Sequence, residues 1–97
     1  MKHLLSYTLD GGIATLAMDD GKVNAMSIEM LEALHGAFDR AERDAAVVLL
    51  TGREGIFSAG FDLRVFPQGR ETTVKMLRLG ATLCERILSF PYPVVTG

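Results

Sequence analysis

The pattern of apolar and polar positions predicts a β-hairpin at the start of the chain. Residues 4–9 and 13–18 have the alternating, β-branched character of half-buried strands. The DGG turn at residues 10–12 supplies the positive-φ positions that a tight hairpin needs. The stretch that follows, residues 18–27, has no regular period and is predicted to be a loop.

The pattern then changes to a helical period. From Ser27 to about Arg43 apolar side chains recur at every third or fourth position, which predicts an amphipathic helix with Ser27 as its N-cap. Residues 46–51, AVVLLT, are apolar at every position but the last. A strand that is apolar on both faces is typical of the middle of a parallel sheet covered on both sides.

A second helix and a last strand complete the pattern. The helix is expected to begin near Thr72 or Thr73 and to end before Pro91, and residues 93–96 are expected to form the strand. The resulting order predicts an α/β fold with a mostly parallel sheet after the initial hairpin. The apolar stripe expected to face the core along this helix is Val74, Leu77, Ala81, Cys84 and Leu88.

Composition and charge argue against several classes of partner. The basic residues are scattered and the net charge is -2, which does not favour nucleic-acid binding. No apolar run approaches the roughly 20 residues of a membrane span. The chain stops at PYPVVTG, which has the character of a strand entering a sheet. We therefore expect residues 1–97 to be the N-terminal part of a single, incomplete domain in a cytoplasmic protein.

The sulfur-containing residues do not indicate a special chemistry. Cys84 is the single cysteine, so it cannot form a disulfide within the chain. We expect it to be a small buried hydrophobic residue, and we interpret Met26, Met30 and Met76 as packing residues. No group of His, Cys and Asp has the spacing of metal ligands, so no metal site is predicted.

The most unusual segment is GREGIFSAGFDL, residues 52–63, which directly follows the apolar strand. Gly52, Gly55 and Gly60 fall within nine positions, which is more than turning a corner requires. Such a composition is suited to holding the main chain in a special shape. Three kinds of site could explain it.

Two of these kinds of site require residues that this sequence does not have at the necessary positions. A phosphate-binding P-loop needs a lysine after its second glycine, whereas Phe61 follows Gly60. A serine-hydrolase elbow around Ser58 needs a glycine where this chain has Ile56. It also needs a histidine, and His35 is expected to be a partly exposed residue of the first helix.

The third kind of site uses the main chain itself. The small residues Ser58, Ala59 and Gly60 allow another molecule to approach closely. A backbone N–H that is not paired within a sheet can stabilise a developing oxyanion, with a contribution of about 2.7–4 kcal/mol for each donor. This explanation requires neither a nucleophile nor a strong base in the segment.

The same residues resemble a known family. GREGIFSAGFDL resembles the F-[SC]-A-G-x-D-[LI] signature of the crotonase superfamily, the enoyl-CoA hydratases and isomerases. Residues 23–27, VNAMS, are similar to the N-A-[LM]-[ST] element before the first helix of the family, and residues 90–97, FPYPVVTG, to its P-x-P-[VIT]-x-x-x-x-G element. The resemblance covers all 97 residues. It implies a crotonase-like ββα spiral core, of which this chain forms the N-terminal portion.

The resemblance implies a site for an acyl-CoA thioester. The backbone N–H of Phe61 would be the first donor of the oxyanion hole, and the carbonyl of Ala59 would accept from the adenine amino group. Many members have alanine in place of Phe61, so its phenyl group would reshape the acyl pocket. The other coenzyme-binding residues that the match implies are Lys22, Val23 and Ala25 in the first loop, and Ser58, Gly60, Asp62 and Leu63 in the glycine-rich segment.

Two of these residues have a second interpretation. Lys22 would meet a coenzyme phosphate as a point charge, or it is a solvated lysine of the loop. Asp62 is expected to accept N–H groups of the loop or of a helix start, rather than to act as a catalytic acid or base.

The implied function is hydration of an enoyl-CoA or isomerisation of its double bond, as in fatty acid metabolism. Coenzyme A enters as part of the substrate, and no prosthetic group is expected. In the family the second oxyanion donor and the catalytic glutamates follow the position of Gly97, and trimers or pairs of trimers are common, so a homo-oligomer is expected. The alternative is a CoA-binding or interaction module without turnover.

Overall fold

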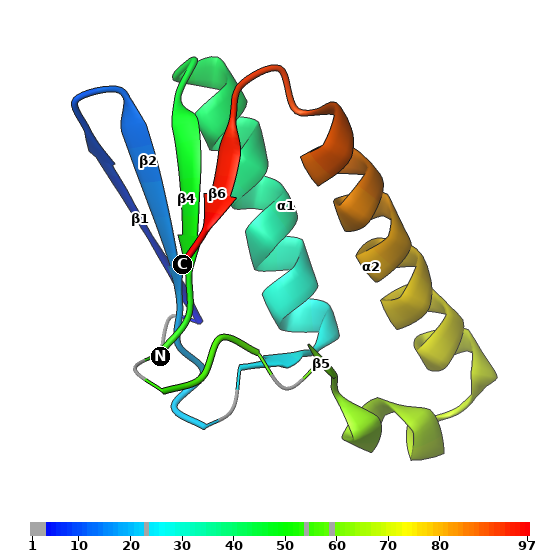
Figure 1. Cartoon of the computed structure of the whole chain (residues 1–97). Helices are drawn as coiled ribbons and strands as arrows, with labels where there is room; N and C mark the ends of the chain where they lie inside the picture. Colours follow the sequence, from blue (N-terminus) through cyan, green and yellow to red (C-terminus); the bar gives the residue numbers. More distant parts are fainter. Residues whose placement is uncertain (1–3, 23, 54, 59) are drawn as a thin grey trace.

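The helices and strands follow the predicted order, with two short strands and a 3-10 helix added around the loops (Figure 1). The computed structural model describes residues 4–22, 24–53, 55–58 and 60–97. The elements are β1 (Leu5–Asp10), β2 (Ile13–Met18), β3 (Ala25–Met26), α1 (Ile28–Arg43), β4 (Val47–Thr51), β5 (Gly60–Phe61), η1 (Leu63–Gln68), α2 (Arg70–Ser89) and β6 (Val94–Thr96).

Four strands form one sheet in the order β1-β2-β4-β6. The hairpin of β1 and β2 is antiparallel, and its turn places Gly11 and Gly12 at φ values of 57° and 79°. β4 pairs in parallel with β2 on one side and with β6 on the other. The predicted hairpin, the mostly parallel sheet and the central position of the apolar strand are therefore confirmed.

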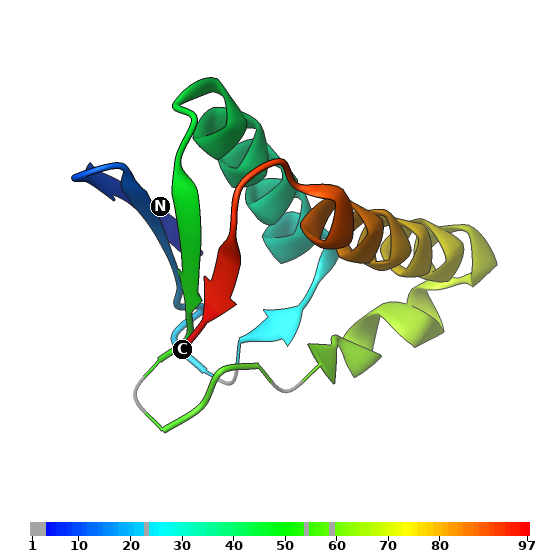
Figure 2. The ribbon, with the colours of Figure 1, turned by 45° about the horizontal axis from the view of Figure 1, so that its top comes forward.

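The two long helices lie side by side on the same face of this sheet (Figure 2). Along β4, Val48 and Leu50 are buried, whereas Val47, Leu49 and Thr51 are only half-buried. Because side chains alternate along a strand, the half-buried set faces away from the helices. The expectation that this strand is covered on both sides is therefore wrong within the part of the chain that the structure describes.

The core lies between the sheet and α1. The hydroxyl oxygen of Ser27 accepts from the N–H of Met30 at 3.1 Å, so the predicted N-cap is confirmed. Phe38 is completely buried, and its ring meets Phe90 edge to face at 5.4 Å between centroids. Further fully or almost fully buried apolar residues are Ala14, Leu16, Met18, Met30, Leu31, Leu34, Ala41, Ala46, Val48 and Met76.

The second helix presents a different face to the core from the one that its sequence predicts. α2 begins at Arg70, a little earlier than expected, and buries Met76, Gly80 and Leu83. The reason is that α2 carries two apolar stripes at helical spacing, and packing against α1 selects only one of them. The predicted stripe is exposed instead, and Cys84 with it, which corrects both expectations: Val74, Leu77, Ala81, Cys84 and Leu88.

The length and polarity of the helices also bear on membrane insertion. No helix within the described ranges is both long and apolar enough to cross a membrane.

Candidate functional site

The glycine-rich segment folds back on itself at Gly52. A Cβ atom on Gly52 would lie 2.4 Å from Cα of Phe57 and 2.6 Å from the carbonyl oxygen of Ile56, far inside ordinary contact distance. The N–H of Ile56 donates to the carbonyl of Arg53 at 3.0 Å, and Gly55 between them has a φ of 81°. Gly52 therefore allows a close approach of two backbone segments, and Gly55 allows the turn.

Asn24 joins the first loop to this segment, although the sequence did not identify it as a functional position. Its side chain is completely buried, and its Nδ2 donates to the carbonyl oxygens of Met18 and Phe57, both at 3.0 Å. Its Oδ1 accepts from the N–H of Asp20 at 2.9 Å. The backbone of Asn24 has a φ of 54°, a conformation that asparagine tolerates better than most residues. Its place at the start of the N-A-[LM]-[ST] element, residues 24–27, was the signal that could have identified it.

Asp20 fixes the backbone of the same loop. Its carboxylate accepts from the N–H groups of Lys22 at 2.7 Å, Asn24 at 2.9 Å and Ala25 at 3.1 Å. Burial alone raises the pKa of Asp20, but these N–H donors outweigh it and hold the pKa below its ordinary value. The Arg53 guanidinium donates to the carbonyl of Lys22. The loop therefore has a defined shape, with the Lys22 side chain exposed on it.

Ser58 serves the backbone rather than acting as a nucleophile. Its hydroxyl donates to the carbonyl of Asn24 at 2.7 Å and accepts from the N–H of Gly60 at 3.0 Å. His35, half-buried as expected, lies between α1 and α2, where its Nε2 is 3.1 Å from the carbonyl oxygen of Leu79. Among the residues that the structure describes, no histidine accompanies Ser58, so the serine-hydrolase explanation gains no support.

Within the described ranges, one edge of the short strand β5 is not paired. Ala25 pairs with Gly60, and Met26 with Phe61, in a two-stranded parallel sheet of β3 and β5. The N–H of Asp62 donates to the carbonyl of Met26 at 3.3 Å. Because successive N–H groups along a strand point to opposite sides, the N–H of Phe61 points away from β3. Within the described ranges it therefore lies on the open edge of this sheet.

Asp62 holds the start of η1, as expected for a structural carboxylate. Its Oδ1 accepts from the N–H of Arg64 at 3.0 Å, and its Oδ2 is 2.6 Å from Nη2 of the same residue. The hydrogen bonds from the Arg64 side chain lower the pKa of Asp62 most, and they outweigh the effect of burial. Because this ionised carboxylate is already engaged, it is poorly suited to proton transfer.

A pocket of about 330 Å³ brings the two predicted segments together. Lys22 and Ala25 line it from the first loop, and Phe61, Asp62 and Leu63 line it from the glycine-rich segment. The side chains of Phe61 and Leu63 are 42% and 74% exposed. The pocket thus combines an exposed cation with an apolar wall, and Phe61 is one of the residues that line it.

The other predicted site residues are Ser58, Gly60, Val23 and Ala59. Ser58 and Gly60 form the backbone that leads to this pocket but do not line it. Val23 and Ala59 lie outside the described residues, so their predicted contacts with coenzyme A stay predictions.

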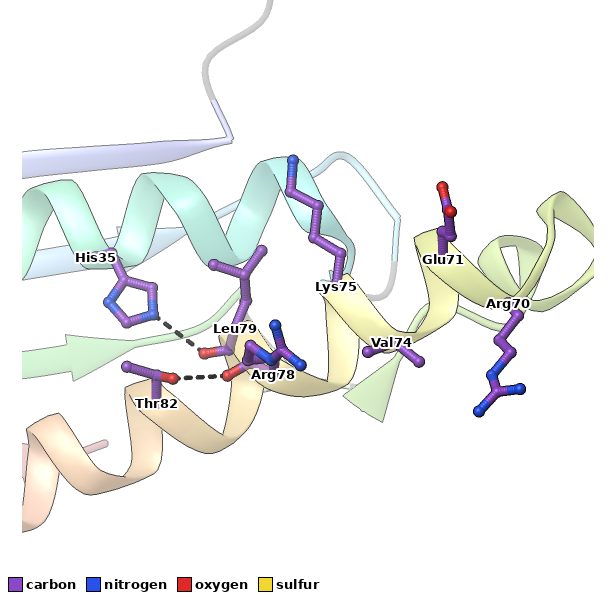
Figure 3. Close-up of a pocket in the computed structure, with 8 residues that line it drawn as sticks. All are labelled: His35, Arg70, Glu71, Val74, Lys75, Arg78, Leu79 and Thr82. Carbon is purple, nitrogen blue, oxygen red and sulfur yellow. Dashed lines mark hydrogen bonds between the residues drawn. The ribbon is translucent and has the colours of Figure 1, made fainter.

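A larger pocket, of about 830 Å³, lies along α2 and shares no residue with the glycine-rich segment (Figure 3). Arg70 points away from Glu71 and Lys75 there, so the charged groups do not converge on one point. Nor does the described part of the chain contain a cluster of three or more His, Cys, Asp or Glu side chains that could hold a metal ion. The smaller pocket is therefore the better candidate for a site of chemistry.

Known proteins are similar to this chain in sequence and in fold. Residues 8–97 match the family model of the enoyl-CoA hydratase/isomerase family. The chain is 35% identical over 99 residues to a probable enoyl-CoA hydratase of Bacillus subtilis, an alignment that covers 98% of this chain and 38% of the relative.

Two solved structures extend the match to three dimensions. An enoyl-CoA hydratase/isomerase family protein from Pseudomonas syringae superimposes with a TM-score of 0.93 at 44% identity, over 96% of this chain and 40% of that one. An enoyl-CoA isomerase of Mycobacterium tuberculosis gives 0.89 at 44% identity, over 96% and 41%. The chain thus spans about two fifths of the length of these relatives. The expected crotonase-type fold is confirmed, and the chain belongs to the enoyl-CoA hydratase/isomerase family.

Proposed function

We propose that this chain supplies one oxyanion donor and part of the coenzyme-binding surface of an enzyme that acts on acyl-CoA thioesters, as an enoyl-CoA hydratase or isomerase. The observation that carries the proposal is the position of the Phe61 N–H. It lies on the open edge of β5, and Phe61 itself lines the pocket. Family membership supplies the thioester class.

Both reactions build negative charge on the thioester oxygen. In hydration, the oxygen of water bonds to C3 of the enoyl group and a proton is added to C2. In isomerisation, a proton leaves C2 and a proton is added at C4. Each passes through an enolate whose charge lies on the thioester oxygen. An N–H held in place by the protein stabilises this enolate more than the neutral substrate, which accelerates the reaction.

The pocket offers complementary chemistry to the rest of the substrate. The ammonium group of Lys22 is available as a point charge for a coenzyme phosphate, because the loop that carries it is fixed through Asp20. The exposed side chains of Phe61 and Leu63 provide apolar contact for the acyl group. Asp62 is assigned no acid–base role, since Arg64 engages its carboxylate.

The test deletes a single N–H and keeps every side chain. The experiment uses the complete gene product. Phenyllactic acid incorporated at position 61 replaces the amide N–H by an ester oxygen. Turnover of crotonyl-CoA is expected to fall by about 10²–10³-fold, with little change in the binding of coenzyme A. The matched control is the same ester at Phe66 in η1, which is expected to leave turnover nearly unchanged. Equal effects of the two esters would contradict the proposal.

Measurements on the wild-type protein distinguish the enzyme from the alternative function, a CoA-binding module without turnover. Calorimetry with crotonyl-CoA measures binding, and loss of the enoyl thioester absorbance measures hydration. Hydration of crotonyl-CoA, or conversion of a 3-enoyl-CoA to the absorbing 2-enoyl-CoA, supports the enzyme. Binding without either reaction selects the module. Assembly as a trimer or hexamer and a cytoplasmic location remain predictions.

A further inference from the structure

Phe61 and Gly80 lie in contact, although η1 and half of α2 separate them along the chain. Gly80 is buried on the face of α2 that turns inward. A Cβ atom on Gly80 would lie 2.7 Å from Cε1 and 2.8 Å from Cζ of the Phe61 ring. Ordinary carbon contacts are about 3.5–4.0 Å, so even a methyl group at position 80 would displace the ring or the helix.

The contact explains a glycine that the helix itself does not favour. Glycine in a helix interior is less favourable than alanine because it has more backbone freedom to lose. The other helical glycine, Gly36 in α1, has open space where its Cβ atom would be. Gly80 differs because the edge of the Phe61 ring occupies that space. The backbone of α2 thus forms a notch that fits the ring.

We propose that Gly80 is a positioning residue for Phe61, and that the ring placed in this way determines which acyl groups the pocket accepts. This inference rests on the proposed function, since it concerns the same site. The ring and the oxyanion N–H belong to one residue, and β5 is only two residues long. A shift of the ring that also moves the Cα atom of Phe61 displaces this N–H with it.

The same ring also limits the volume of the pocket in which the acyl group is proposed to bind. One end of the ring rests against Gly80, and Phe61 lines the pocket with Ala25 and Leu63. A straight acyl group can pass along this wall, whereas a group branched at C3 needs the space that the ring occupies. The favoured substrates are therefore thioesters with unbranched acyl groups.

The test is a double-mutant cycle in the protein as its gene encodes it. Gly80→Ala is expected to lower kcat/KM for crotonyl-CoA by about 10²-fold, mainly through kcat, because displacing the oxyanion donor by about 1 Å costs that much. When Gly80→Ala is added to the Phe61→Ala variant, kcat/KM for crotonyl-CoA is expected to fall by less than about 2-fold, since no ring remains to be displaced. If Gly80 has a structural role but does not position Phe61, Gly80→Ala lowers kcat/KM equally in the wild-type protein and in the Phe61→Ala variant. That result would overturn the inference.

A second measurement tests the acyl preference. Phe61→Ala keeps the N–H and removes the ring, so the ratio of kcat/KM for 3-methylcrotonyl-CoA to that for crotonyl-CoA is expected to rise at least about 10-fold. An unchanged ratio overturns the inference even where Gly80→Ala fails to fold. Gly36→Ala is the matched control, because its methyl group meets no atom within 4 Å, and it is expected to leave both substrates unaffected.

The two proposals fail in different ways. A wild-type protein that neither binds nor converts crotonyl-CoA overturns the proposed function and this inference together. This inference alone is overturned if the wild-type protein is active but Gly80→Ala lowers kcat/KM equally with and without the Phe61 ring. It is also overturned alone if the protein is active and Phe61→Ala leaves the acyl preference unchanged.

Discussion

Asn24 Nδ2 donates to the carbonyl oxygen of Phe57 at 3.0 Å, and this bond joins two loops that are far apart in the sequence. The first loop carries Lys22 and leads into β3, and the second leads into β5 and Phe61. Both loops contribute to the same pocket. The distance between the cation and the oxyanion donor therefore depends on an uncharged side chain that lines neither end of the pocket.

Replacing Asn24 by alanine is expected to lower the free energy of unfolding by about 2–3 kcal/mol. The carbonyl groups of Met18 and Phe57 would lose their donors, and an unpaired buried polar group costs about 1–3 kcal/mol. Urea unfolding measures the change. Asn24→Gly is the control, because glycine adopts the φ of 54° without strain. A loss in Asn24→Ala that Asn24→Gly does not share would assign the effect to the backbone instead.

Gly52→Ala is expected to disturb the glycine-rich segment through a collision of atoms. The added methyl group would lie 2.4 Å from the Phe57 backbone, so the segment has to move, at a cost of about 1–3 kcal/mol. Binding of coenzyme A is expected to weaken with it. The comparison is Gly55→Ala, where the space is open but the φ is 81° and strain costs about 1–2 kcal/mol. Loss of coenzyme affinity only in Gly55→Ala would show that the close approach at Gly52 is unimportant.

Acid is expected to destabilise the fold through Asp20 and Asp62. Both have a pKa below the ordinary value of 3.8 in the folded chain, so the folded state binds fewer protons than the unfolded state in this range. Their contribution is fully present above pH 3.8 and is lost as the pH falls through the lower folded values. Free energies of unfolding measured between pH 7 and pH 2 are expected to decline only in the acidic part of this range.

The Asp20→Asn variant assigns this acid effect to its source. The amide has one oxygen in place of two, so the variant is expected to be less stable at pH 7 and to lose less stability on acidification. Asp10→Asn, at the exposed hairpin turn, is the control and should follow the wild-type curve. If the free energy of unfolding of Asp20→Asn declines with acid as steeply as that of the wild type, the N–H contacts of the Asp20 carboxylate do not determine the acid response.

The sequence was sufficient to predict the elements whose cause is local. Gly11 and Gly12 provide a turn conformation that few other residues adopt, and Ser27 provides an N-cap to the residues directly after it. These features require no knowledge of distant contacts. The signature around Phe61 similarly identified the segment that ends at the open edge of β5.

Long-range contacts could not be predicted in the same way. The role of Asn24 depends on Phe57, and the notch at Gly80 depends on Phe61. Each pair is brought together only by the complete fold. The element that begins at Asn24 does not reveal its partner Phe57, and Gly80 has no distinctive local pattern. A helix interior favours alanine over glycine, so the glycine at position 80 runs against local preference. Such a residue is expected where a tertiary contact leaves no space for a side chain.

The exposed stripe of α2 leads to a prediction that separates the two helix faces with one type of substitution. Leu83 is 7% exposed and Leu88 is 88% exposed, whereas the sequence pattern assigned Leu88 to the core. Leu83→Ala is expected to lower the free energy of unfolding by about 2–5 kcal/mol, because it leaves a cavity. Leu88→Ala is expected to change it by less than about 0.5 kcal/mol. Urea unfolding of both variants checks the assignment, and a larger loss at Leu88 would mean that α2 is rotated about its axis.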